Sequence, residues 1–221
     1  MGRDTKRILG TSAAFAACAL VLAATGNAFA GERAASLTAS FGPERSTYVA
    51  VGAATRAPIG WAEFCIEYDP ECRTKPSTPR DVVLTPKAWA DMIKVNTWVN
   101  ENITPITDLE HWGVVERWNY PDDGKGDCED YVLLKRRMLM QAGWPREALL
   151  ITVVRDKKNE GHAVLTVKTN RGEFILDNQE TEIFPWTKTG YRFVKRQSQS
   201  DPNVWVTLGE PTASPPMVSA R

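Results

Sequence analysis

The sequence predicts an α+β domain in which helices come first and an antiparallel sheet follows. Up to about residue 142, the apolar residues recur with the 3.6-residue period of helices. From residue 149 onward they alternate with the period of two that strands show, and Asn170-Arg171-Gly172 is a turn between two such segments. A run of helices followed by a run of strands is typical of an α+β architecture.

The first 30 residues have the pattern of an export signal. Three basic residues within the first seven precede a small apolar stretch, and Ala28-Phe29-Ala30 has the form of a cleavage site. A retained membrane anchor and lipidation at Cys18 are the alternatives that this stretch leaves open. We therefore expect residues 1–30 to be a signal peptide and the mature protein to be periplasmic or secreted.

The rest of the chain divides into three parts. Residues 31–56 are rich in small residues and predict a loosely packed N-terminal arm. Residues 57–210 are long enough for one domain with its own core, and residues 211–221 form a Pro- and Ser-rich tail that we expect to be disordered. The 27 basic and 27 acidic residues balance, which argues against binding to nucleic acid.

Local signals place the elements of the domain in order. Residues 61–72 predict a short helix, and Thr85 followed by Pro86 predicts the start of a helix that ends near residue 102. A third helix is predicted from Cys128 to residue 142, with Gly143 as its stop signal. Predicted strands follow at residues 149–154, 162–168, 173–177, 191–196 and 204–208.

The three cysteines beyond the predicted signal divide into a pair and a single residue. Cys65 and Cys72 are seven residues apart, and in an exported protein such a pair predicts a disulfide. A zinc site is disfavoured because no second cysteine pair or paired histidine has metal-ligand spacing. Cys128 is left unpaired, which favours either a buried core thiol or a functional one.

Cys128, His162 and Asp177 are candidates for a catalytic triad. A thiol, an imidazole and a carboxylate in this order are the parts of a thiol acyl-transfer site. A two-residue turn after Thr169 sets Val164 opposite Asp177 and puts His162 on the same face of the sheet. The imidazole and the carboxylate then become diagonal neighbours, unless the register slips by one residue.

Three carboxylates surround the candidate nucleophile. Asp127, Glu129 and Asp130 would disfavour a thiolate at Cys128 unless something neutralises them. A bound cation is one solution. The alternative is that Asp127 caps the helix while Glu129 and Asp130 face water in its first turn.

These segments together resemble the bacterial transglutaminase-like cysteine peptidases. The resemblance lies in Gly126-Asp127-Cys128-Glu129-Asp130-Tyr131, His162-Ala163-Val164-Leu165, Leu176-Asp177-Asn178 and the Cys65–Cys72 segment, and it extends over about residues 57–208. It implies a papain/transglutaminase-like core whose nucleophile helix packs on an antiparallel sheet. It also implies that Cys128 is the nucleophile, His162 the base and Asp177 the orienting acid.

The best-known members of this family resemble LapG, a periplasmic, calcium-dependent protease that releases large surface adhesins and so controls biofilm attachment. The resemblance therefore implies calcium at Asp127, Glu129 and Asp130, a protein substrate of the adhesin class and an inner-membrane regulator as partner. Two other functions stay open from the sequence: acyl transfer to an amine instead of water, and a non-catalytic secreted binding module.

Overall fold

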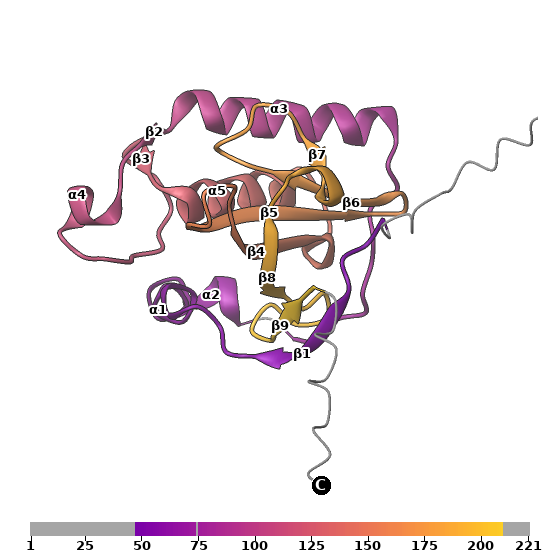
Figure 1. Ribbon diagram of the computed structural model, residues 1–221, viewed down its shortest axis with the longest axis horizontal. Helices are drawn as coiled ribbons and strands as arrows, with labels where there is room; N and C mark the ends of the chain where they lie inside the picture. Colours follow the sequence, from indigo (N-terminus) through magenta and orange to yellow (C-terminus); the bar gives the residue numbers. More distant parts are fainter. Residues whose placement is uncertain (1–46, 74, 210–221) are drawn as a thin grey trace, which may run out of the picture. The chain divides into compact units, whose positions relative to one another are not determined.

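The computed structural model describes residues 47–73 and 75–209, shown as a ribbon in Figure 1. The predicted signal peptide, residues 31–46 of the predicted arm and the predicted tail lie outside the described residues. The described elements mix helices with a large antiparallel sheet, which confirms the predicted α+β class.

Neighbouring strands of a seven-stranded sheet run antiparallel in the order β1-β9-β8-β4-β5-β6-β7. Its strands are β1 (Val51–Thr55), β4 (Leu149–Arg155), β5 (Gly161–Thr169), β6 (Gly172–Leu176), β7 (Phe184–Pro185), β8 (Arg192–Gln197) and β9 (Trp205–Leu208). A short parallel pair, β2 (Thr104–Pro105) and β3 (Lys125–Gly126), lies apart from it.

One part of the predicted N-terminal arm needs correction. Residues 51–55 are not loosely packed but form β1, which pairs with β9 at the edge of the sheet. Its sequence, Val-Gly-Ala-Ala-Thr, has no apolar alternation, and all five residues are exposed. Because β1 is held in the sheet by backbone pairing alone, the pattern of its side chains could not predict this strand.

The helices are α1 (Ile59–Glu67), α2 (Asp69–Cys72), α3 (Pro86–Asn102), α4 (Asp108–Trp112) and α5 (Cys128–Gln141), with short 3-10 turns at Arg146–Ala148 and Trp186–Lys188. The predicted start of α3 is confirmed, because Oγ1 of Thr85 accepts a hydrogen bond from the backbone N–H of Ala88. Gly143, with φ of 88°, lies beyond the end of α5, where glycine adopts this angle without steric cost.

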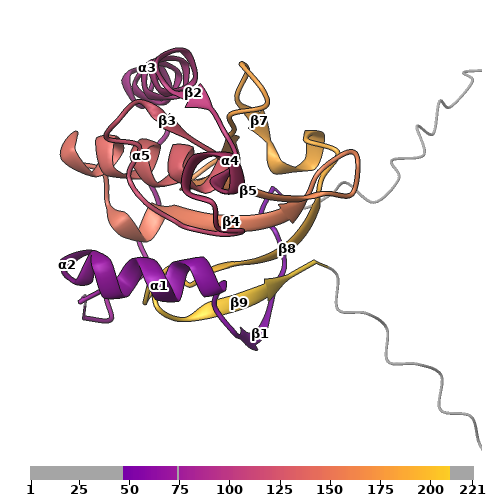
Figure 2. The ribbon, with the colours of Figure 1, turned by 90° about the vertical axis from the view of Figure 1, so that its left-hand side faces the viewer.

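The main core lies between α5 and the sheet, and α3 packs beside α5 (Figures 1 and 2). Met92 and Val99 of α3, Leu133 and Leu139 of α5 and Leu165 of β5 belong to one buried cluster. The aromatic rings of α1 also join it. A rigid core therefore fixes the position of the first turn of α5 relative to strand β5.

The predicted β5–β6 register is confirmed. Thr169 pairs with Gly172, and the pairing continues to Leu165 opposite Leu176. Asp177 follows directly after β6, and His162 is the second residue of β5. The hairpin thus brings the imidazole and the carboxylate to the same end of the sheet.

Candidate active site

Three elements hold the predicted triad. Cys128 is the first residue of α5 and is half-buried, whereas His162 in β5 and Asp177 after β6 are 4% and 3% exposed. The other histidine, His111, is in α4 and pairs with Asp123 at 2.8 Å. The structure therefore leaves one buried histidine next to the candidate nucleophile.

Asp177 orients His162 through a short hydrogen bond. Nε2 of His162 lies 2.8 Å from Oδ1 of Asp177. The same carboxylate accepts a hydrogen bond from the Tyr191 hydroxyl at 2.7 Å and one from the Gln179 backbone N–H at 2.9 Å. Burial acts to raise the pKa of Asp177, but these donors and the charge of His162 outweigh it and lower that pKa. The acid is thus held ionised, with three donors around it.

The hydrogen bond to Asp177 leaves the other imidazole nitrogen available. Nδ1 of His162 is 3.4 Å from Nε2 of the exposed Gln179 side chain. When Nε2–H donates to Asp177, Nδ1 is the unprotonated nitrogen and can accept a proton. This is the tautomer that a general base next to a thiol requires.

Cys128 and His162 line one cavity of about 300 Å³. Its other walls are Pro58, Glu116, Trp118, Glu129, Val153, Gly161, Ala163 and Lys195. The indole N–H of Trp118 donates to a carboxylate oxygen of Glu116 at 2.7 Å, which fixes the ring. Gly60 of α1 lies so close to this ring that a Cβ atom there would clash with it. The wall of the cleft is therefore held from behind by α1.

Two contacts determine the state of the Cys128 thiol. The backbone N–H of Ala163 donates to Sγ at 3.4 Å, and Sγ donates to Oε2 of Glu129 at 3.1 Å. Burial, followed by the charge of Glu129, raises the pKa of Cys128 well above its ordinary value. Burial and the contact with Glu129 therefore oppose formation of the thiolate.

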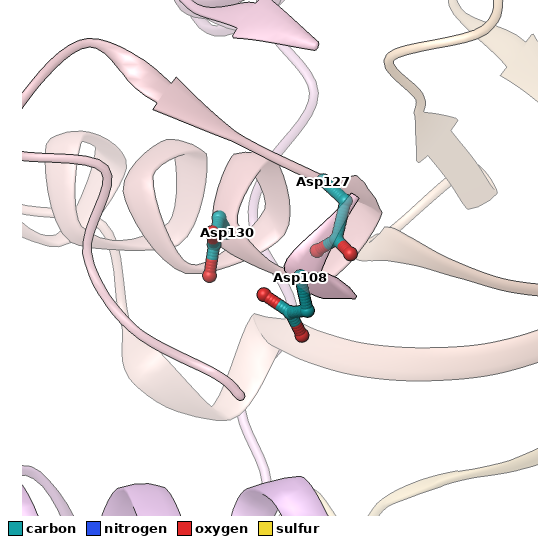
Figure 3. A group of neighbouring side chains, drawn as sticks. All are labelled: Asp108, Asp127 and Asp130. Atoms are coloured by element: carbon teal, nitrogen blue, oxygen red, sulfur yellow. The ribbon is translucent and has the colours of Figure 1, made fainter. Parts of the chain in front are cut away.

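The structure brings two of the three predicted metal ligands together and adds a third. Asp108, Asp127 and Asp130 each offer a carboxylate oxygen, and these oxygens lie within 4.8 Å of one another (Figure 3). The group does not include Glu129, whose carboxyl group lies beside the Cys128 thiol and also interacts with Asp127. Residues 127 and 130 are three apart at the start of α5 and so share a side of the helix.

The alternative that Asp127 caps the helix while Glu129 and Asp130 face water does not describe these carboxylates. The side chain of Asp127 makes no cap hydrogen bond to α5, and Glu129 and Asp130 are 5% and 0% exposed. Oδ1 of Asp127 and Oδ2 of Asp130 are buried, and neither has a hydrogen-bond partner within residues 47–73 and 75–209. Buried carboxylate oxygens without donors are costly, and a hard cation is the partner that oxygens of this kind prefer. The three aspartates fit a calcium ion.

Burial also perturbs these aspartates in the absence of a cation. It raises the pKa of Asp130 to about 8, although the backbone N–H of Asn119 donates to its Oδ1 at 2.9 Å. It likewise raises the pKa of Asp127. Such shifts indicate that the negative charges of the cluster lack sufficient compensation from the protein itself.

Sequence analysis missed Asp108. Thr107 and Glu110 form a capping box at the start of α4, which places Asp108 in the first turn of that helix. The parallel pairing of β2 with β3 then brings residues 104–108 alongside residues 125–127. The capping box could be recognised in the sequence, but no sequence pattern indicates the parallel pairing of two-residue strands. Gln179 and Tyr191 also carried no sequence signal for their contacts with the dyad.

The predicted disulfide is present. Cys65 of α1 is bonded to Cys72 of α2, and Cys128 is free. The bond joins α1 to α2. Only the free thiol lines the cleft.

The chain is similar to one protein family and to several solved structures. A family model described as "Bacterial transglutaminase-like cysteine proteinase BTLCP" matches residues 51–213. Among solved structures, calcium-bound LapG of Legionella pneumophila is similar, with 26% identity over 58% of this chain and 75% of that chain and a TM-score of 0.48. The EGTA-treated form of the same protein gives 26% identity over 55% of this chain and 71% of that chain and a TM-score of 0.46.

Two further searches give negative results. No curated protein matches the chain. Within the described ranges, no helix combines the length and the apolar character that crossing a membrane requires.

The family model covers most of the chain, including all the residues that line the cleft. The chain therefore belongs to the bacterial transglutaminase-like cysteine proteinase family and is a cysteine peptidase.

Proposed function

We propose that this peptidase hydrolyses peptide bonds of a protein substrate through Cys128, His162 and Asp177. The observation that carries the proposal is the 2.8 Å contact between Nε2 of His162 and Asp177. It fixes the tautomer whose Nδ1 can act as base, in the cavity that His162 shares with the Cys128 thiol. His162 then acts as the base, Asp177 as the orienting acid and Cys128 as the nucleophile.

The reaction follows from these positions. Nδ1 of His162 takes the proton from Sγ of Cys128, and the thiolate attacks the scissile carbonyl carbon. The imidazolium, stabilised by Asp177, then protonates the leaving amine, and water hydrolyses the thioester. The backbone N–H of Cys128, at the first residue of α5, has no intrahelical acceptor and can donate to the developing oxyanion.

Calcium held by Asp108, Asp127 and Asp130 is part of this proposal. When bound, the ion supplies positive charge that offsets the carboxylates beside the nucleophile. The protein contributes the ligands from two separate elements, the start of α4 and the start of α5, and the ligand set thereby ties these elements together. Glu129, which the family resemblance placed among the ligands, contacts the Cys128 thiol.

The family resemblance extends the proposal to the substrate and the compartment. We place the enzyme outside the cytoplasm, in the periplasm or secreted, as the signal-like residues 1–30 and the disulfide indicate. A large surface adhesin is the proposed substrate and an inner-membrane regulator the proposed partner, so that the peptidase would act on biofilm attachment.

The test compares matched variants on surface proteins extracted from the source cells. His162→Ala removes the proposed base, and His111→Ala removes the other histidine of the sequence as a control. We expect Cys128→Ala and His162→Ala to abolish proteolysis, with losses on the order of 10⁴ or more, and His111→Ala to stay close to wild type. Equal losses in both histidine variants, or activity of Cys128→Ala within about tenfold of wild type, would refute the mechanism.

A further inference from the structure

Lys135 is a buried cation that the proposed reaction does not use. It lies in the third turn of α5, its side chain is 0% exposed, and its Nζ has no hydrogen-bond partner in the described part of the chain. Its neighbour Arg136 is equally buried but bonds to the carbonyl oxygen of Leu149 and lies 3.8 Å from Glu71. The two adjacent cations thus leave α5 in different directions, and only Arg136 has protein partners of its own.

Lys135 faces the side of α5 that packs against α3. Its Nζ lies 5.9 Å from the centre of the Tyr131 ring, and the Tyr131 hydroxyl donates to the carbonyl oxygen of Ile103 at the end of α3. The negative charge of Asp177 acts on Lys135 from the same side, although burial is the larger effect and lowers the pKa of Lys135 to about 7. The ammonium of Lys135 and the carboxylate of Asp177 therefore interact electrostatically through the protein interior.

The segment that carries Asp177 is anchored to α3 by two asparagines. Nδ2 of Asn100 donates to the carbonyl oxygens of Asp177 and Glu180, at 2.8 and 3.3 Å, and Nδ2 of Asn96 donates to that of Thr181 at 3.4 Å. These bonds hold the backbone of residues 177–181 against the helix. Asp177 is therefore positioned by α3 as well as by its own side-chain contacts.

Polar oxygens remain unpaired on α3 and next to Asp177. The Oδ1 atoms of Asn96, Asn100 and Asn178 are buried, and no described residue donates to them. An ammonium carries three donors and no acceptor, so it complements a group of buried amide oxygens. Buried polar groups of this kind are normally satisfied directly or through ordered water.

We propose that Lys135 is a positioning residue of the triad, whose ammonium completes the polar layer between α3, α5 and residues 177–181 and thereby fixes Asp177 against His162. The inference rests on the triad of the proposed function and goes beyond it, because Lys135 touches neither the substrate nor the reacting atoms. An apolar residue of similar length would fill the space without holding the acid.

The experiment uses the mature protein in calcium-containing buffer and compares Lys135→Met with Arg136→Met. Each variant removes one buried cation from α5, but only Lys135 is directed to the Asp177 side. The first readout is the rate at which iodoacetamide alkylates Cys128 at neutral pH, which needs no knowledge of the substrate. The second is the proton NMR signal of the His162 Nε2–H that donates to Asp177, which is simple to assign because the sequence has two histidines.

We expect Lys135→Met to slow alkylation by roughly tenfold or more and to broaden or remove the His162 signal, since small misplacements of catalytic groups cost up to 10²-fold. Arg136→Met should keep both readouts close to wild type, even where its thermal stability falls. Lys135→Gln is measured alongside so that a folded variant is available. It keeps a donor without the charge, and we expect an intermediate effect.

The outcomes separate this inference from the proposed function. If Cys128 of the wild-type protein does not react with iodoacetamide, the triad of the proposed function is refuted. A reactive wild type together with a folded Lys135 variant that keeps the wild-type rate and His162 signal would overturn only the role of Lys135. The same would follow if Arg136→Met lost both readouts as Lys135→Met does, because the effect would then be a general loss of packing.

Discussion

Nε2 of His162 lies 2.8 Å from Oδ1 of Asp177, and His162 is in β5 while Asp177 directly follows β6 of the same hairpin. Both are almost fully buried, and the carboxylate has two further donors. The imidazole is therefore held in one tautomer before any substrate binds. Because such preorganisation determines how readily the thiol loses its proton, the variants of Asp177 and its donors probe the dyad directly.

Asp177→Asn should reduce kcat/KM on the order of 10⁴-fold, because an amide no longer stabilises the imidazolium or selects its tautomer. Tyr191→Phe removes one of the three donors to Asp177 and leaves the imidazole bond in place. We expect a loss of about tenfold or less for that variant. Steady-state kinetics on one substrate checks both, and equal effects would contradict a dyad centred on Asp177.

Much of the fold and of the triad follows from local patterns. Thr85-Pro86 marks the start of α3, Gly143 lies beyond the end of α5, and the Asn170-Arg171 turn fixes the register that brings His162 to Asp177. These features depend on neighbours in sequence, where capping and turn chemistry act.

The parts that the sequence did not reveal depend on contacts between distant segments. Asp108 reaches Asp127 through the pairing of two-residue strands, and β1 is held by backbone bonds to β9 without side-chain alternation. The family resemblance grouped Glu129 with Asp127 and Asp130, whereas the group of neighbouring carboxylates consists of Asp108, Asp127 and Asp130. The helical spacing of three residues relates only the two aspartates, and it was a usable signal.

Asp108→Asn tests the ligand set that the structure adds. The amide keeps an acceptor for the backbone N–H of Arg117 but loses the charge that calcium prefers. We expect calcium affinity to fall at least about tenfold, as for Asp127→Asn, by calorimetric titration of chelator-treated protein.

Asp122→Asn is the matched control for that titration, because Asp122 is exposed and pairs with Arg137 outside the aspartate group. It should bind calcium as wild type does. An Asp108→Asn protein that kept wild-type affinity would exclude Asp108 as a ligand.

The stability of the cation-free protein should depend on pH through Asp130. Burial raises the pKa of Asp130 from its ordinary 3.8 to about 8, so the folded protein prefers the protonated form more than the unfolded chain does. Its contribution to stability is thus fully present below about pH 4 and is lost as the pH rises through 8.

Melting temperatures measured across this range in chelator should therefore decline toward alkaline pH. Calcium should abolish most of the decline, and its stabilising effect should grow with pH, because the ion binds the ionised carboxylates. Asp130→Asn in chelator should show a flatter profile than wild type. A wild-type curve that rises from pH 5 to 8 in chelator would contradict the assignment.

Loss of the Cys65–Cys72 disulfide should lower stability by ~2 kcal/mol, because the short loop that it closes restricts the unfolded chain. For a domain of this size that corresponds to a fall in melting temperature of about 4–8 °C. Cys65→Ser/Cys72→Ser tests this by thermal denaturation, with Cys128→Ser as the single-thiol control that keeps the bond. Thiol counting on the unfolded, unreduced mature protein should find one reactive group, and three would show that the pair is not bonded.

The most direct test of the account is the fate of solvent oxygen at the cleavage site. The mature enzyme, with calcium, is incubated with extracted surface proteins in water enriched in ¹⁸O, and new peptide termini are identified by mass spectrometry. Hydrolysis of a Cys128 thioester predicts new carboxyl termini that carry ¹⁸O and are missing with Cys128→Ala. The same labelled termini with Cys128→Ala, or an amine in place of the labelled oxygen at the acyl carbon, would contradict it.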